Sequence, residues 1–361
     1  MSVASLWEKA INSHVLAFLM LCFKPRDPFG HLSSVNKKHE IYLQRSFIFA
    51  VWCRQDLVKI VRISIVKLFF LAWVLSSSLA CRPQSSEIDR KSHITYSNFS
   101  ESHGWQIWQA DVKTLNTQQL TWSKDEAYYP SWGPKGELAY SDHNGRLWLL
   151  KAGLGSKDQQ AEQLSSLPKY CGHPAISPDG KRLACVCFDF VNRSEDSDLF
   201  LVDLDSKTSE RLIVLPGLQK YPAWSPDGQK LVFSSGYRES GEQIVEQLWL
   251  LYFANKVPVK IVDNGHSNIN PAWSPDGKRI AYSSDVNGSL DIWLYDLDAR
   301  QTAPLTQHDA MEADPAWRPD GSGLVYLSTR EGPMGLWEID FATQQEKKLL
   351  LLKEDIHEPT W

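Results

Sequence analysis

One short motif recurs along the chain, and this repetition constrains the possible fold more than any other feature. Its clearest copy is "PAWSPDGKRIAYSS", residues 271–284, and related copies begin at residues 130, 174, 222 and 315. The residue two places after the first proline sets the period, because its successive positions are 44 to 49 residues apart. These positions are Trp132, Ile176, Trp224, Trp273, Trp317 and Trp361. Such a period predicts an array of equivalent structural units.

A second aromatic position follows the same period. It lies in short segments such as "QLWLLY" and "DIWLYD" and is occupied by Trp108, Trp148, Phe200, Trp249, Trp293 and Trp337. Ten of the 15 tryptophans therefore fall on two repeated positions. This regularity predicts packing residues rather than ligand-binding residues.

Each unit has the pattern of a small antiparallel sheet. Segments such as "RIAYSS" and "DIWLYDL" are rich in β-branched and aromatic residues, which favour strands. The "SPDG" between the first two strands is a hairpin turn, since proline presets φ, aspartate bonds its own backbone and glycine takes a left-handed conformation. Weaker strands such as "APLTQ" complete a four-stranded unit of about 45 residues, the size of one propeller blade. The turn aspartates, which we do not expect to be catalytic, are Asp179, Asp227, Asp276 and Asp320.

The number of units predicts a closed ring. Five complete units run from Pro130 to about Leu352, and "HEPTW" then supplies a first strand with nothing after it. Residues 93–123 supply strands two to four of a blade that lacks its first strand. The sequence therefore predicts an all-β fold, a six-bladed β-propeller of four-stranded blades whose ring is closed by a blade made from both termini. Closure of this kind matters because an open array would expose sheet edges that invite aggregation.

The repeat "PAWSPDGKRIAYSS", followed by "LDIWLYDLD", resembles that of TolB-like β-propellers. This family includes the periplasmic protein TolB and the propeller domains of tricorn-type and prolyl-oligopeptidase-type peptidases. The resemblance covers about residues 94–361 and implies a fold but no particular activity. TolB carries an α/β domain before its propeller, whereas residues 1–93 show no βαβ pattern, which argues against a direct role in a Tol–Pal system.

The segment before the propeller contains a lipoprotein-like signal. Residues 61–81, "VRISIVKLFFLAWVLSSSLAC", combine basic residues, a short apolar core and small residues before a cysteine. We expect Cys81 to carry a lipid anchor that holds the mature protein in the cell envelope, facing the periplasm; the alternative is an exported protein without the anchor. Residues 82–93 would form a linker to the propeller at 94–361. Residues 1–60 are a doubtful extension, because translation that begins at Val61, read from a GTG codon, would leave them out of the protein. The alternative is that they are a genuine N-terminal extension.

Three of the six cysteines lie in the propeller: Cys171, Cys185 and Cys187. Cys185 and Cys187 share one face of a strand, and pairing of the hairpin across "SPDG" would bring Cys171 close to Cys187. An envelope location permits a disulfide in this strand pair, and the sequence leaves open whether Cys171 would bond to Cys185 or to Cys187. The alternative is that these cysteines are buried free thiols that replace larger core residues.

The candidate binding site is formed by the residues that precede each repeated proline. If the first strand of each blade lines the central channel, these residues form a ring at the channel mouth. They are Tyr129, His173, Tyr221, Asn270, Asp314 and Glu358. Such a mixture of aromatic, amide and acidic side chains is typical of surfaces that recognise a peptide or protein. The long loops 189–198 and 236–247 are expected on the same face.

The sequence favours binding over catalysis. It contains no nucleophile elbow, phosphate-binding loop or HExxH zinc motif, and we predict no cofactor or metal site. A net charge of −5 argues against nucleic acid as a partner. We therefore predict a non-enzymatic envelope propeller that binds envelope proteins or peptides as a scaffold or assembly component. The alternative is a propeller lyase, lactonase or glycan-acting hydrolase that uses His173, Asp314 or Glu358, with His266, His308 and His357 near the same loops.

Overall fold

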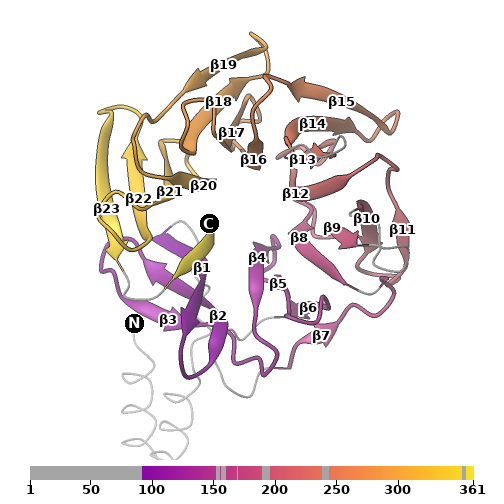
Figure 1. Ribbon diagram of the computed structural model, residues 1–361. Coiled ribbons are helices and arrows are strands. Elements are labelled where there is room, and N and C mark those ends of the chain that lie inside the picture. Colours follow the sequence, from indigo (N-terminus) through magenta and orange to yellow (C-terminus); the bar gives the residue numbers. More distant parts are fainter. Residues whose placement is uncertain are drawn as a thin grey trace, which may run out of the picture. The chain divides into compact units, whose positions relative to one another are not determined.

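The computed structural model describes residues 92–361, except for 152–154, 156–159, 169, 189–195, 238–243 and 352–354. Six four-stranded antiparallel sheets surround a central axis, as Figure 1 shows. The predicted six-bladed propeller is thus confirmed. Among the described residues, none forms a helix long and apolar enough to cross a membrane. The predicted signal segment with Cys81, and the doubtful extension before it, lie outside the described residues.

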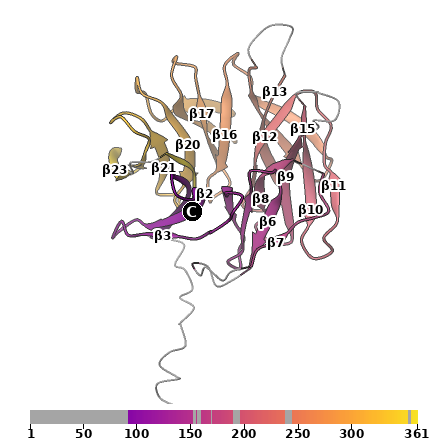
Figure 2. The ribbon, with the colours of Figure 1, turned by 60° about the horizontal axis from the view of Figure 1, so that its bottom comes forward.

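Five blades are each built from consecutive strands, with the first strand innermost. The innermost strands contact one another around the axis, and Figure 2 shows several of them side by side. From the inside outward, these blades are β4 (Tyr128–Trp132), β5 (Leu138–Ser141), β6 (Leu147–Leu150) and β7 (Glu162–Gln163); β8 (Cys171–Ile176), β9 (Arg182–Phe188), β10 (Ser197–Asp203) and β11 (Ser209–Arg211); β12 (Leu218–Trp224), β13 (Lys230–Gly236), β14 (Gln247–Tyr252) and β15 (Val257–Val262); β16 (Asn268–Trp273), β17 (Arg279–Ser284), β18 (Asp291–Asp296) and β19 (Gln301–Pro304); and β20 (Glu312–Trp317), β21 (Gly323–Ser328), β22 (Gly335–Asp340) and β23 (Gln345–Leu351).

The sixth blade joins the two ends of the propeller. Its strand order is β24 (Ile356–Thr360), β1 (His93–Ser100), β2 (Gly104–Asp111) and β3 (Thr117–Gln119). Antiparallel pairing aligns Asn98 with Ile356 and Thr95 with Thr360. The C-terminal strand therefore occupies the innermost place of this blade, as the incomplete last repeat predicts.

Within the described residues, the hydrophobic core is divided into six clusters, each formed by two neighbouring blades. One cluster, for example, joins Val186 and Leu199 of the β8–β11 blade to Leu231 and Phe233 of the β12–β15 blade. Residues of the second aromatic series, such as Trp249, pack against these clusters. Burial of apolar surface between blades, at about 25 cal/mol per Å², is therefore what holds the ring together.

The tryptophans two places after the repeated proline also form hydrogen bonds to the preceding blade through their ring nitrogens. Trp317 Nε1 donates to the carbonyl oxygen of Ala272 at 3.0 Å, and the Arg279 guanidinium stacks 4.8 Å from the Trp317 ring centroid. Trp224 and Trp273 donate in the same way to the carbonyl oxygens of Ala175 and Ala223. The repeated tryptophan thus connects neighbouring blades, which confirms its predicted packing role.

The "SPDG" segments form turns, as the sequence predicts. In the first of them, Asp179 Oδ1 accepts hydrogen bonds from Ser177 Oγ at 2.6 Å and from the Lys181 amide at 3.0 Å, and Gly180 has a φ of 68°. These hydrogen bonds, with the Ser177 hydroxyl first, lower the pKa of Asp179. The Asp179 carboxylate therefore stabilises the turn through hydrogen bonds with the Ser177 hydroxyl and the Lys181 amide.

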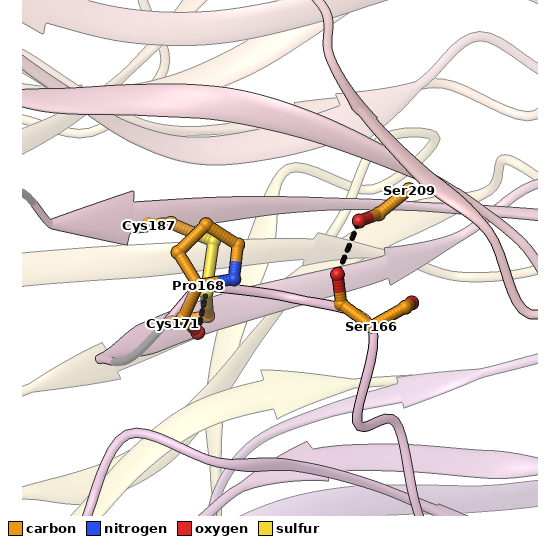
Figure 3. The surroundings of a disulfide bond; sticks show 5 residues. All are labelled: Ser166, Pro168, Cys171, Cys187 and Ser209. Atoms are coloured by element: carbon orange, nitrogen blue, oxygen red, sulfur yellow. Dashed lines mark hydrogen bonds between the residues drawn. A yellow bond between two sulfur atoms is a disulfide. The ribbon is translucent and has the colours of Figure 1, made fainter.

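A disulfide joins Cys171 and Cys187, which are paired residues of β8 and β9 (Figure 3). Cys185 is buried and free. The sequence leaves open whether these cysteines form a disulfide or remain buried free thiols. The structure contains a disulfide between Cys171 and Cys187, whereas Cys185 is a buried free thiol.

Candidate functional site

The six residues predicted to form a ring all line one cavity of about 540 Å³ on the propeller axis. They also share one backbone conformation, since each has a left-handed φ between 50° and 57°. Left-handed φ is uncommon for residues other than glycine and tends to cluster at functional sites. Its recurrence in all six blades shows that the fold uses this conformation to direct six side chains toward the axis.

A β-bulge in each inner strand produces this conformation. In β12, Lys220 pairs with Ser234 and Ala223 pairs with Val232, so Tyr221 and the proline after it are left out of the register. Proline has no N–H to donate to the sheet, and a bulge places it where no such hydrogen bond is needed. The ring residues therefore lie within the inner strands rather than in the loops that lead into them.

The cavity extends from the ring toward the "SPDG" turns. Its lining includes residues that follow the ring in each inner strand, among them Trp132, Trp273 and Trp317, and reaches turn prolines such as Pro178. None of the described residues that precede the ring in an inner strand lines it. The second strands end at the opposite end of the blades from the "SPDG" turns, for example at Phe188 in β9 and Gly236 in β13, so the cavity does not extend toward these strand ends. Residues 189–195 and 238–243 of the long loops 189–198 and 236–247 are outside the described residues.

Aromatic side chains occupy one half of the ring. The ring centroids of Tyr129 and His173 are 4.0 Å apart, and those of His173 and Tyr221 are 4.5 Å apart. His173 is only 9% exposed, and its Nδ1 has no hydrogen-bond partner among the described residues. Burial, assisted by the nearby charge of Lys220, lowers the pKa of His173 to about 3. The imidazole is consequently neutral at physiological pH.

The other half of the ring consists of Asn270 and the acidic residues Asp314 and Glu358. Glu358 Oε2 accepts hydrogen bonds from Ser97 Oγ at 2.8 Å and from the Tyr129 amide at 2.7 Å. The Glu358 amide in turn donates to Asp314 Oδ2 at 3.2 Å, which links the two acidic residues directly. Burial, with a further contribution from the Asp314 charge, raises the pKa of Glu358 to about 8. Burial also raises the pKa of Asp314.

Three other histidines, which the sequence predicts near the channel mouth, do not line the cavity: His266, His308 and His357. The His357 ring packs 5.0 Å from that of Trp105, and His266 Nδ1 lies 3.5 Å from a carboxylate oxygen of Asp285. His308 Nδ1 accepts a hydrogen bond from a backbone amide two residues away. Within the described part of the chain, no group of three or more histidine, cysteine or acidic residues is placed to hold a metal ion.

One charged cluster near the ring was not predicted from the sequence. Arg330 forms ion pairs with the fully buried Glu312 and with Glu346, and its guanidinium stacks 4.4 Å from the Trp337 ring centroid. Glu312 begins β20, two residues before Asp314. The only sequence signal for this cluster is an acidic residue at the start of an otherwise apolar inner strand. Because its charges are paired, we assign the cluster a structural role.

Comparison with known proteins agrees with this architecture. Residues 88–361 match the TolB beta propeller domain. TolB from Acinetobacter baumannii is 21% identical, with 75% of this chain and 66% of that chain covered and a TM-score of 0.63. A putative TolB from Agrobacterium tumefaciens is also 21% identical, with 73% and 89% covered and a TM-score of 0.57. An oligogalacturonate lyase in complex with manganese is 17% identical, with 72% and 74% covered and a TM-score of 0.51.

These solved structures establish a shared fold and no shared activity, since their sequence identities are low. This chain spans just under two thirds of the length of the Acinetobacter protein. A comparison with curated protein sequences finds no match. The family match covers all six blades, and the chain therefore belongs to the TolB β-propeller domain family.

Proposed function

We propose that this protein is a non-enzymatic β-propeller of the cell envelope that binds a protein or peptide partner in its central cavity. In this role it would serve as a scaffold or assembly component. The proposal depends chiefly on one observation: the six ring residues, which differ from blade to blade, all line the same cavity, and repeated tryptophan and proline residues form much of the remaining wall.

The chemistry of the cavity suits a peptide segment. Its volume of about 540 Å³ is within the usual range for ligand sites. Tryptophan and proline form much of its wall and offer apolar contact, whereas the ring supplies hydrogen-bonding groups at one end. Buried aromatic side chains are also the residues that contribute most to binding energy in protein interfaces.

A lipid anchor at Cys81 would hold the propeller at a membrane surface, with residues 82–93 as the connection. The disulfide between Cys171 and Cys187 supports an oxidising compartment such as the periplasm. The mass of the intact protein from the membrane fraction tests this part of the proposal. A mature chain that begins with an acylated Cys81 supports it, and peptides from residues 20–50 in that mature protein contradict it.

Partner capture tests the role of the cavity. Thr360→Arg places a long charged side chain on a residue that lines the cavity, whereas Thr117→Arg makes the same change on exposed β3 in the same blade. Both variants and the wild type are crosslinked in the envelope, purified in detergent and analysed by mass spectrometry. We expect one set of partners to be captured by the wild type and Thr117→Arg and to be lost with Thr360→Arg. Equal capture by all three proteins contradicts the proposal.

A further inference from the structure

The cavity is acidic and has no basic side chain to balance it. Asp314 and Glu358 line it, and among the described residues no lysine or arginine does. Lys220 is close enough to affect His173, but its ammonium is paired with Glu246 at 3.0 Å, and it precedes the ring in β12. The two carboxyl groups therefore face a space in which this chain supplies no cation.

Each of these carboxyl groups keeps one oxygen available. The hydrogen bonds from Ser97 and Tyr129 both end on Oε2 of Glu358, and the bond from the Glu358 amide ends on Oδ2 of Asp314. Oε1 of Glu358 and Oδ1 of Asp314 have no hydrogen-bond partner within the described part of the chain. Two backbone amides and the Ser97 hydroxyl thus hold the two carboxyl groups in place, and each carboxyl group keeps one oxygen that can accept a further hydrogen bond.

The other half of the ring favours the same kind of ligand. The faces of aromatic rings such as Tyr129 and Tyr221 attract cations. His173 is more than nine-tenths buried in the ring, and its unpartnered Nδ1 in a neutral imidazole is able to accept an N–H donor. The apolar wall beyond the ring suits a methylene chain, because lysine and arginine side chains bury their stems along apolar surfaces.

We propose that the ring binds one organic cation, the ammonium of a lysine or the guanidinium of an arginine on the partner, between Asp314 and Glu358. This inference rests on the proposed function, since it specifies which part of a partner enters the cavity. A divalent metal fits less well, because calcium takes six to eight oxygen ligands and the ring offers two carboxyl groups.

Binding of a cation should release a proton. Glu358 is faced by Ser97 from β1 and by four ionisable groups: Tyr128 and Tyr129 from β4, Tyr221 from β12 and Asp314 from β20. His357 is a further ionisable neighbour that acts on Asp314. Burial keeps the Glu358 carboxyl protonated up to about pH 8. A lysine ammonium remains charged to about pH 10 and would replace this proton, so its affinity should rise as the pH approaches 8.

A matched pair of small probes tests the inference on the full-length protein in detergent. Nα-acetyl-lysine methylamide carries the side-chain ammonium, and Nα-acetyl-norleucine methylamide has a similar aliphatic side chain without the ammonium. Calorimetric titrations at pH 6 and pH 8.5 should show the lysine probe binding about 10-fold or more tightly at the higher pH, with no such change for the norleucine probe. Glu358→Gln and Asp314→Asn should each weaken lysine binding at pH 8.5 by about 10-fold.

Control variants separate these effects from loss of folding. Glu101→Gln and Asp298→Asn make the same substitutions at exposed positions and should bind the lysine probe like the wild type. Circular dichroism and thermal melting show whether the ring variants are folded. Equal binding of both probes, or unchanged binding in both folded ring variants, overturns the inference, as does displacement of the lysine probe by calcium or manganese.

The two proposals fail in different ways. If Thr360→Arg abolishes partner capture but the lysine probe does not bind the wild type, the cavity remains a partner site and the cation inference is wrong. If partner capture is the same in the wild type and in Thr360→Arg, the proposed function itself is wrong, whatever the probe does.

Discussion

Replacing Glu358 with glutamine should make the stability of the fold less sensitive to pH. Burial raises the pKa of Glu358 from an ordinary 4.5 to about 8. Between these values the folded protein keeps a proton that the unfolded chain has released, so a rise in pH favours unfolding. The stabilisation is present in full below pH 4.5 and is lost as the pH rises through 8.

The size of this change in stability follows from the pH range between the two pKa values of Glu358, 4.5 and about 8. Each pH unit within it changes the free energy of unfolding by about 1.4 kcal/mol, so the three units from pH 5 to pH 8 correspond to about 4 kcal/mol. The raised pKa of Asp314 acts in the same direction and is coupled to that of Glu358. Glutamine releases no proton and keeps an oxygen for Ser97 and the Tyr129 amide. The variant should therefore gain stability relative to the wild type as the pH rises.

Urea unfolding followed by tryptophan fluorescence measures this gain. The difference in free energy of unfolding between Glu358→Gln and the wild type should increase by about 3 to 4 kcal/mol from pH 5 to pH 8. Exposed Glu101→Gln should show no such change. A difference for Glu358→Gln that is the same at both pH values would refute the argument, because it would mean that Glu358 does not hold a proton in the folded protein.

Three further predictions concern the stability of the ring. Replacing both Cys171 and Cys187 with serine should lower the free energy of unfolding in urea by about 3 kcal/mol, since the bridge closes a short loop; an unchanged urea midpoint would contradict this. Truncating Ile356, which is fully buried, to alanine should cost about 2 to 5 kcal/mol in the same assay, and a loss below 1 kcal/mol would argue against β24 as part of the ring. In a double-mutant cycle with Arg279→Met and Trp317→Phe, the stacked pair should show a coupling of about 0.5 to 1 kcal/mol, whereas strict additivity would show that the stacking contributes nothing.

Much of the fold could be predicted because each blade repeats the same local information. The "SPDG" turn fixes the first hairpin of a blade, and the alternation around it fixes which residues are buried. The same repetition predicts that Asp314 and Glu358, which are 44 residues apart, are neighbours in the ring. The hairpin register also predicts that Cys171 lies near Cys187, but whether two nearby thiols are oxidised depends on the compartment as well as on the sequence.

The conformation of the ring could not be predicted in this way. The left-handed backbone of Tyr221 results from its place in a bulge between two paired strands, and the only local sign is the proline that follows it. The stacking of Arg279 on Trp317 joins different blades and depends on how they are tilted. The raised pKa of Glu358 likewise depends on its burial and on contacts with Ser97, Tyr129 and Asp314 from three other strands, which no local pattern in the sequence specifies.

The closing strand also has a consequence for biosynthesis. Ser97 and Glu358, which bond across the sixth blade, are 261 residues apart. At about 5 to 20 residues per second, roughly 10 to 50 seconds separate the synthesis of β1 from that of its inner neighbour. Throughout that time the hydrogen-bonding edge of β1 has no partner strand from its own chain, and an unpaired edge is a template for aggregation. A nascent propeller of this kind therefore has a particular need for a chaperone that covers its first strands until the last one arrives.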